Sequence, residues 1–489
     1  MTERTASSEG AQGRADPGKA RPAKPGAKVA AGRPLDGIPL LEDLPDVAGR
    51  RVLVRCDFNV PLREVDSAES ESARINGVRD LALLNGTAGW SPTMEIADDF
   101  RIRAALPTLN WLTERGASVT TCTHLGRPGG KPNPRYDVAP VRERLAELAP
   151  GVRLEQNLRF DPGEEANSPT FVDELVDGFD LYVNDAFGAS HRFHASVVGP
   201  PSRLPSAAGR LLQKEVEMLG GLLGRPARPF VAVVGGAKVS DKLGVLHSLL
   251  DRVDQLLVGG AMAFTFLVAA GHSAGDSLVD IAGVEACKSL LDEAGERLLL
   301  PTDVLAICGT PRPQGSSRSD RKQVGESRAL GGETRPQRGG SSGVLKPDGP
   351  SGVLKPEGPF GDVFEEVRKK GRDVPEGWCG LDIGPETAAR FREVILGAGT
   401  VFWNGPMGKF EDDRFSAGTA VVAQAMAESR AFTVVGGGDS AAALDRLGLA
   451  HRVDFVSTGG GASLEFLELG DLPGLAALRA AGNAPHSAR

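Results

Sequence analysis

Short apolar runs recur along most of the chain, and each is followed by a segment with helical spacing of apolar positions. The runs rich in Val, Leu and Ile are RVLVRCDF, ASVTTCTHL, LYVNDAF, FVAVVGG, QLLVGG, TVFWNG, FTVVGGG and VDFVSTGGG. This alternation is typical of parallel sheets covered by helices, so we predict an α/β fold. Ligands in such folds bind beyond the carboxyl ends of the strands. Nearly every run ends in Gly, Asn, Asp or His, which indicates a polar site at those ends.

Three segments depart from this pattern. Residues 1–35 are rich in Ala, Gly, Pro, Lys and Arg, so we expect a disordered tail; a transit peptide is the alternative, which three acidic residues disfavour. A polar insertion at about 63–95 interrupts a strand-to-helix pattern. A second insertion, at about 309–359, is dominated by Gly, Pro, Ser and Arg and ends in the tandem nonamers SGVLKPDGP and SGVLKPEGP. We expect a surface loop there, with a partner-binding device as the alternative.

Composition narrows the classes of function. The 489 residues carry a net charge of -8, which argues against a general nucleic-acid binder because phosphate backbones require broad basic surfaces. The longest apolar stretch, at 256–271, is too short to span a bilayer comfortably, so we expect no membrane association. The five cysteines form no CxxC pair, which indicates neither a zinc site nor a disulfide framework and favours a reducing compartment.

The strand ends of the first half supply cations. The motifs FRIRAALP, HLGRP, NLRF and NDAFGASHRFHAS contribute Arg101, Arg127, Arg159 and Arg192, with His124 and His194 nearby. A single Arg after a strand is usually a surface ion pair. Several at the ends of parallel strands converge in one crevice, and guanidinium groups suit phosphate and carboxylate together.

The strand ends of the second half are glycine clusters, which let a backbone approach a phosphate closely. Lys238 and Lys242 follow one of them, four positions apart, and would share a face if a helix follows; a solvated helix start is the alternative. Asp439 follows three glycines. A carboxylate at a phosphate site needs an intervening cation, which favours a Mg²⁺ contact, and a helix N-cap is the alternative.

A dinucleotide-binding enzyme is a rival hypothesis, because GGGDSA matches G-x-G-x-x-A after a strand. That fingerprint requires an acidic residue at the end of the next strand. Asp454 instead precedes FVSTGGG, and no G-x-x-x-x-G-K-[ST] loop occurs anywhere in the chain.

The ordered motifs RCDFNVP, HLGRP, NLRF, NDAFGASHRFHAS, GGAKVSDKL, GGAMAFTF, LDIGP, WNGPMGKFE, VVGGGDSAAA and STGGGASLEFLE closely resemble the phosphoglycerate kinase family. The resemblance extends from about Arg51 to DLPGLAAL near the end of the chain, outside the tail and both insertions. It implies a monomer with two Rossmann-like domains whose parallel sheets face a central cleft.

The resemblance also implies the domain limits. They are an N-terminal substrate domain at 36–206, a hinge helix at 207–224, a nucleotide-binding domain at 225–470 and a segment at 471–489 that packs back on the first domain. The implied activity is the reversible transfer of the acyl phosphate of 1,3-bisphosphoglycerate to ADP, giving 3-phosphoglycerate and ATP in the glycolysis of the cytoplasm.

Motif by motif, the resemblance implies the residues of two sites. The 3-phosphoglycerate site would contain Asp57, Phe58, Asn59, Arg101, His124, Leu125, Gly126, Arg127, Arg159 and Arg192. The nucleotide site would contain Gly236, Lys242, Gly260, Leu381, Asn404, Pro406, Glu411, Gly437, Gly438, Asp439 and Ser440. Asp439 would face Mg²⁺, and the catalytic groups would be Arg101, Lys238, Lys242, Gly437 and Gly438.

Three departures from the family's pattern limit how far the family's site residues can be assigned to this chain. Lys409 replaces a usually apolar residue near the adenine, the second insertion replaces a loop that helps to cover the nucleotide, and the first insertion separates DFNVP from FRIRAALP. None removes a charged catalytic position. An active kinase is therefore the prediction, with a non-catalytic binding or structural descendant of the fold as the alternative.

Overall fold

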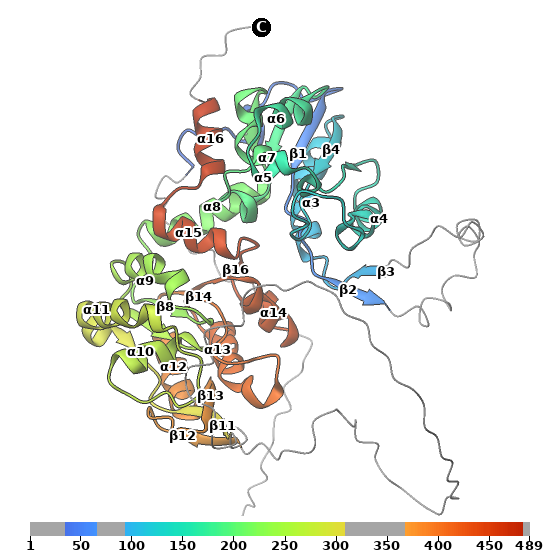
Figure 1. Cartoon of the computed structure of the whole chain (residues 1–489). Coiled ribbons are helices and arrows are strands. Elements are labelled where there is room, and N and C mark those ends of the chain that lie inside the picture. The colour runs from blue at the N-terminus through green and yellow to red at the C-terminus, as the bar shows by residue number, and fades with distance from the viewer. Residues whose placement is uncertain (1–34, 66–92, 309–366, 483–489) are drawn as a thin grey trace, which may run out of the picture.

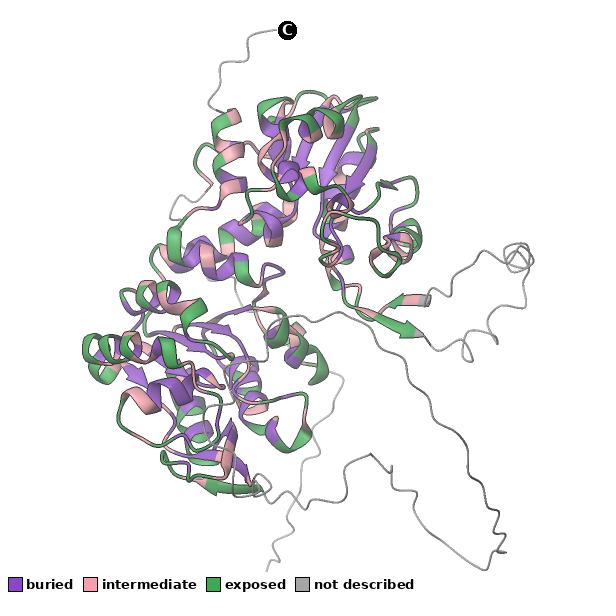
Figure 2. Ribbon diagram, viewed as in Figure 1, coloured by how far each residue is buried: buried purple, intermediate pink, exposed green. Residues whose placement is uncertain are grey.

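The computed structural model describes residues 35–65, 93–308 and 367–482, which form two lobes of sheet and helix (Figure 1). All eight apolar runs contain strands of two parallel sheets, so the predicted α/β fold is confirmed. These strands carry few polar residues because helices cover both faces of each sheet. Figure 2 shows the strands of both lobes as mostly buried.

The first lobe is built on a five-stranded parallel sheet with the order β5-β4-β1-β6-β7. Its strands are β1 (Arg51–Arg55), β4 (Ser118–Cys122), β5 (Arg153–Leu154), β6 (Leu181–Asn184) and β7 (Ser206–Ala208). Its helices are α3 (Phe100–Thr113), α4 (Ala139–Leu148), α5 (Pro162–Glu165), α6 (Pro169–Val176) and α7 (Ala195–Val198). Short 3₁₀ turns connect them at η1 (Leu41–Asp43), η3 (Pro134–Tyr136), η4 (Leu158–Phe160), η5 (Phe187–Ala189) and η6 (Pro200–Ser202).

The second lobe is built on a six-stranded parallel sheet with the order β10-β9-β8-β14-β15-β16. Its strands are β8 (Phe230–Val234), β9 (Gln255–Val258), β10 (Leu298–Leu299), β14 (Thr400–Asn404), β15 (Phe432–Gly436) and β16 (Phe455–Val456). Its helices are α9 (Leu243–Leu250), α10 (Met262–Ala269), α11 (Val284–Ala294), α12 (Pro385–Gly397), α13 (Ala417–Glu428), α14 (Gly438–Arg446) and α15 (Gly461–Leu469).

Two smaller antiparallel sheets were not predicted. One is the three-stranded order β12 (Val367–Lys370), β11 (Val304–Cys308) and β13 (Trp378–Ile383). The other is a hairpin of β2 (Leu62–Val65) and β3 (Thr93–Ile96), in which both ends of the first insertion pair with each other. The remainder of that insertion, the whole of the predicted loop at 309–359 and the tail before Leu35 lie outside the described residues.

Helix α8 (Arg210–Leu223) connects the two lobes (Figure 1). The hinge helix predicted at 207–224 begins three residues late, because Ser206–Ala208 pairs with β6 as an edge strand. After α15 the chain returns to the first lobe as α16 (Pro473–Gly482), which contacts α7, η6 and β7. The amide of Gly474 donates to the carbonyl oxygen of Ser190 at 2.9 Å.

One apolar cluster runs through both lobes. It contains Phe187 from η5, Leu212 from α8, Phe466 from α15 and Leu475 from α16, all fully buried. The rings of Phe187 and Phe466 meet edge to face at 6.1 Å. No helix among the described residues has the length and apolar character required to cross a bilayer.

Candidate active site

In the first lobe, the predicted site residues follow the carboxyl ends of β1, β4, β5 and β6, except Arg101, which lies in α3. Asp57 follows β1, and Arg101 lies in the first turn of α3; the two side chains form an ion pair. The first insertion therefore does not prevent its flanking motifs from meeting. Burial opposes the ionisation of Asp57, but the charge of Arg101 and further nearby cations hold the pKa of this carboxyl below its usual value.

The HLGR turn is fixed from two sides. The amide of Gly126 donates to Asn59 Oδ1 at 2.9 Å, and Arg159 Nη1 donates to the carbonyl oxygen of Gly126 at 2.8 Å. Gly126 has φ 62°, and the ring of Tyr136 occupies the place that a Cβ atom would need. Only glycine fits this turn, which brings Asn59 and Arg159 together.

The neighbouring residues Phe58 and Leu125 contribute mainly through their backbones, since both side chains are buried in the core of the lobe. The amide of Phe58 donates to Thr123 Oγ1 at 2.9 Å, and that of Leu125 donates to Asn157 Oδ1 at 3.2 Å. The first bond links the ends of β1 and β4, and the second links the end of β4 to the segment after β5.

Arg127 and Arg192 are exposed, and the structure gives their guanidinium groups no hydrogen bond or ion pair within the described residues. Arg159 is more enclosed, and its Nε lies 3.1 Å from Glu165 Oε1. Together with Arg101, these residues give the strand ends of the first lobe the cationic character that the sequence predicts. Such a surface suits a phosphorylated carboxylic acid.

In the second lobe, Lys242 is largely enclosed at the end of β8. Its Nζ donates to the carbonyl oxygen of Gly235 at 2.6 Å and to Asn404 Oδ1 at 3.1 Å. Burial lowers the pKa of Lys242 to about 8, and the charge of Asp439 partly opposes that shift. The buried Nδ2 of Asn404 has no hydrogen-bond partner among the described residues, so a donor is available for a bound oxygen.

Lys238 differs from Lys242. The two lysines do not share a helical face, because α9 begins only at Leu243 and a 3₁₀ turn occupies 240–242. Lys238 is exposed in the turn before it. The pair therefore combines one enclosed and one accessible ammonium group.

Glycines bring three strand ends within backbone contact. A Cβ atom on Gly260, which has φ 67°, would lie 2.7 Å from the amide nitrogen of Gly236 and 2.8 Å from the carbonyl oxygen of Pro406. Larger residues would separate these turns. The sequence-predicted positions Gly236, Gly260 and Pro406 are thus adjacent.

The N-terminus of α14 supplies the last part of the site. Gly437, at φ 94°, is the N-cap, so the alternative role of Asp439 as N-cap is wrong. Asp439 is exposed in the first turn, and the space where Gly438 would carry a Cβ atom contains no atom within 4 Å. Ser440 Oγ accepts a 2.6 Å hydrogen bond from the amide of Gly405 and so joins α14 to the end of β14.

Two further predicted positions, Leu381 and Glu411, lie near Lys409, the residue that departs from the family pattern. Leu381 is half-buried in β13, and its carbonyl oxygen accepts a 2.8 Å hydrogen bond from the amide of Lys409. Lys409 and Glu411 are both exposed. The lysine that departs from the family pattern therefore lies on a loop whose backbone is tied to Leu381.

Comparison with known proteins identifies the family. A model described as phosphoglycerate kinase matches residues 89–155, 149–329 and 360–469. A phosphoglycerate kinase of Salinispora tropica is 45% identical over 469 residues, covering 90% of this chain and 98% of the relative. The chain belongs to the phosphoglycerate kinase family.

Further members of the family are similar to this chain in sequence and in structure. A phosphoglycerate kinase of Rubrobacter xylanophilus is 44% identical over 456 residues, covering 88% of this chain and 96% of that protein. The solved phosphoglycerate kinases of Coxiella burnetii and Pyrococcus horikoshii superpose with TM-scores of 0.65 and 0.67 at 33% and 27% identity. Each covers 90% of this chain and is itself covered to 98%. The expected two-domain phosphoglycerate kinase fold is confirmed.

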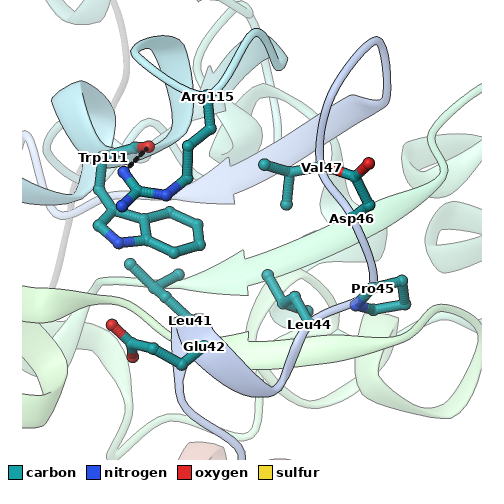
Figure 3. Close-up of a pocket in the computed structure, with 8 residues that line it drawn as sticks. All are labelled: Leu41, Glu42, Leu44, Pro45, Asp46, Val47, Trp111 and Arg115. Atoms are coloured by element: carbon teal, nitrogen blue, oxygen red, sulfur yellow. Dashed lines mark hydrogen bonds between the residues drawn. The ribbon is translucent and has the colours of Figure 1, made fainter.

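Two pockets among the described residues of this phosphoglycerate kinase family member lie away from the predicted sites. Figure 3 shows one of about 510 Å³, lined by Leu41, Glu42, Leu44, Pro45, Asp46, Val47, Trp111 and Arg115. Another of about 360 Å³ lies between Phe193 and α16. Neither is lined by a residue predicted for either site, and the cationic strand ends are the better candidate because they carry the matching chemistry.

Two polar groups beneath the first site were not predicted from the sequence. Arg55 is fully buried, yet it stands inside the apolar run RVLVRCDF, and a cation at the end of a buried strand was the available signal. Asn157 was quoted only within NLRF. Its amide group bonds both the amide and the carbonyl oxygen of Leu125, so it holds the HLGR turn.

Proposed function

We propose that this chain catalyses reversible phosphoryl transfer between 1,3-bisphosphoglycerate and ADP, using the two groups of strand-end residues described above. The observation that carries the proposal is their complementary chemistry. Arginines gather at the strand ends of the first lobe. Glycine turns and Lys242 gather at those of the second, together with Asn404 Nδ2, which has no partner in the described part of the chain. The first set suits an anionic acid and the second suits a nucleotide polyphosphate.

In this proposal, Arg127, Arg159 and Arg192 bind the phosphate at the far end of the substrate. Arg101, aligned by its ion pair with Asp57, lies at the phosphoryl group that is transferred. An acyl phosphate leaves as a carboxylate, and the nucleophile of the reverse reaction is already ionised. The reaction therefore needs no general base, and positioning with charge neutralisation is sufficient.

The nucleotide side fits a Mg²⁺-nucleotide complex. Within the described residues Asn404 Nδ2 lacks a partner, Gly438 leaves open space at a helix N-terminus, and Asp439 offers an exposed carboxylate. The described residues contain no cluster of three metal-binding side chains, which agrees with the usual binding of Mg²⁺ through one or two carboxylates and the ligand's phosphates. The ion, when bound, neutralises phosphate charge, while Lys238 and Lys242 donate to the phosphoryl oxygens.

We further propose that the two lobes close by bending about α8, which excludes water from the acyl phosphate. The buried carboxylate of Glu215 on α8 accepts hydrogen bonds from the amide (2.6 Å) and the hydroxyl (2.8 Å) of Thr458, so α8 is tied to the strand-end loop after β16. We also propose that the chain is a cytoplasmic monomer without membrane partners, as the family resemblance implies, and the net charge of -8 argues against a general nucleic-acid partner.

The assignment of Asp439 is tested by its substitution with Asn. The variant should need a several-fold higher Mg²⁺ concentration for half-maximal rate, because one carboxylate ligand is lost. Asp445→Asn is the matched control, since Asp445 is an exposed carboxylate at the other end of the same helix. A magnesium titration of Asp439→Asn that superposes on those of the wild type and the control would contradict the assignment.

A further inference from the structure

Beneath the substrate site, a buried anion and a buried cation are bridged by one hydroxyl group. Glu164 in α5, Ser196 in α7 and Arg55 in β1 are all fully buried. Glu164 Oε1 accepts from Ser196 Oγ at 2.6 Å, and Glu164 Oε2 accepts from the amide of Ser196 at 2.8 Å. Arg55 Nε donates to the same hydroxyl at 2.9 Å. The carboxylate thus balances the buried guanidinium through Ser196, which a buried charge requires.

The other two donor nitrogens of Arg55 connect it to the residues of the predicted substrate site. Its Nη1 donates to the carbonyl oxygen of Cys56, and its Nη2 lies 3.1 Å from His124 Nδ1. A guanidinium group has only donors, so Nδ1 must be the acceptor and the ring proton must be on Nε2. The pKa of His124 lies well below its usual value, first because the ring is buried. The charge of Asp57 opposes this shift, and those of Arg55 and two other arginines add to it. His124 is therefore a neutral imidazole with a defined tautomer.

The remaining ring nitrogen is the one that a ligand can use. His124 Nε2 has no hydrogen-bond partner within the described part of the chain, whereas all three donor nitrogens of Arg55 are engaged. An N–H group at this position can donate to a carboxylate or phosphate oxygen without titrating near neutral pH. With the other tautomer, Nε2 would present a lone pair to that oxygen and repel it.

We propose that Glu164 and Ser196 are positioning residues for the kinase reaction, holding Arg55 so that His124 presents its Nε2–H to the bound acid. The proposal rests on the assignment of His124 to the substrate site. It adds the buried chain Glu164–Ser196–Arg55, which connects α5, α7 and β1 to the turn after β4 and which touches neither substrate nor nucleotide.

The test compares two variants that remove hydrogen bonds at the same residue, Ser196: one removes both bonds of its hydroxyl group, and the other removes a bond to its carbonyl oxygen. Ser196→Ala breaks the chain, whereas Tyr182→Phe removes the 2.7 Å bond from the Tyr182 hydroxyl to the Ser196 carbonyl oxygen and leaves the chain intact. Ser196→Thr restores the hydroxyl, and Glu164→Gln serves as a second variant if Ser196→Ala does not fold. The chain has seven histidines, so ¹⁵N spectra of histidine-labelled protein can report the tautomer of His124 without any ligand.

The wild type, Tyr182→Phe and Ser196→Thr should show His124 protonated at Nε2. Ser196→Ala should show both tautomers, together with a several-fold rise in KM for 3-phosphoglycerate and an unchanged KM for ATP. An unchanged tautomer in folded Ser196→Ala, or equal effects of Ser196→Ala and Tyr182→Phe on KM, would overturn the proposal. A changed tautomer with unchanged KM would also overturn it, and would locate the error in the assignment of His124 to the substrate site.

Discussion

Lys242 is a cation whose pKa in the folded protein lies close to neutral pH. Burial lowers its pKa to about 8, so in the free enzyme its charge is present below that pH and is lost above it. We expect kcat/KM for the nucleotide to fall as pH rises through about 8, because the neutral amine attracts phosphate less. The measurement is a pH profile of the wild type and of Lys242→Arg, which retains its charge. A wild-type profile that is flat through this range would show that the charge of Lys242 is dispensable.

At single positions, the sequence was informative where a rare motif assigned a side chain and uninformative where burial decided its role. The ion pair of Asp57 and Arg101 follows from two motifs that had to meet in one crevice. Arg55 was missed because apolar neighbours in a strand predict core, and nothing in one sequence reveals that Glu164 and Ser196 lie beside it. The common helical face of Lys238 and Lys242 was wrong because the chain first forms a 3₁₀ turn.

At the scale of elements, α8 is held by two buried carboxylates, Asp185 at its N-terminus and Glu215 in its second turn. Asp185 accepts from the amides of Leu211 (2.9 Å) and Leu212 (3.3 Å), and Glu215 accepts from Thr458. Burial raises the pKa of each carboxyl to about 7. Since the folded state holds these protons more tightly than the unfolded state, both contributions to stability are present at acid pH and are lost as pH rises through about 7.

Glu215→Gln should therefore flatten the dependence of stability on pH. For a shift from 4.5 to about 7, the fully buried carboxyl contributes about 3 kcal/mol to the fall in the free energy of unfolding across this range. Urea unfolding below and above this range measures it, with Glu217→Gln as the control because Glu217 is exposed on the same helix. Equal pH dependence in the wild type and Glu215→Gln would mean that Glu215 titrates normally.

The second insertion joins two strands that pair with each other. Ile307 of β11 lies opposite Val367 of β12 in antiparallel register, so both ends of the insertion are adjacent. Replacing residues 315–358 with a short Gly/Ser linker should leave Tm and kcat nearly unchanged, because lengthening a loop costs only about 0.6 kcal/mol per doubling. Any effect should fall on KM for ATP. A several-fold loss of kcat or an unfolded product would show that the insertion belongs to the working structure.

The elements differ in how well a single sequence predicts them. Strands of the parallel sheets were predictable because they are continuous apolar runs with polar ends. The sheet of β11, β12 and β13 was not, because an insertion separates β11 from β12, and the VRKK sequence of β12 lacks an apolar pattern. The hairpin of β2 and β3 was not predictable either, because the first insertion separates its two strands.

At the scale of the molecule, the lobes are coupled by more than one connection. α8 links them, and α16 returns to the first lobe, where Arg479 Nε donates to the carbonyl oxygen of Asp36 at 3.0 Å. The edge-to-face contact of Phe187 in η5 with Phe466 in α15 is a further link. The sequence alone predicted two domains only through resemblance to a family, because the periodicity of apolar residues does not reveal which helices return to a distant sheet.

The most direct test of the kinase activity is steady-state turnover of the full chain with 3-phosphoglycerate, ATP and Mg²⁺, measured by coupling the product to NADH oxidation. The proposed function predicts turnover that requires all three components and is lost when any one is omitted. A folded sample that binds both 3-phosphoglycerate and Mg²⁺-ATP but shows no turnover would contradict it, and would identify the chain as a non-catalytic descendant of the phosphoglycerate kinase fold.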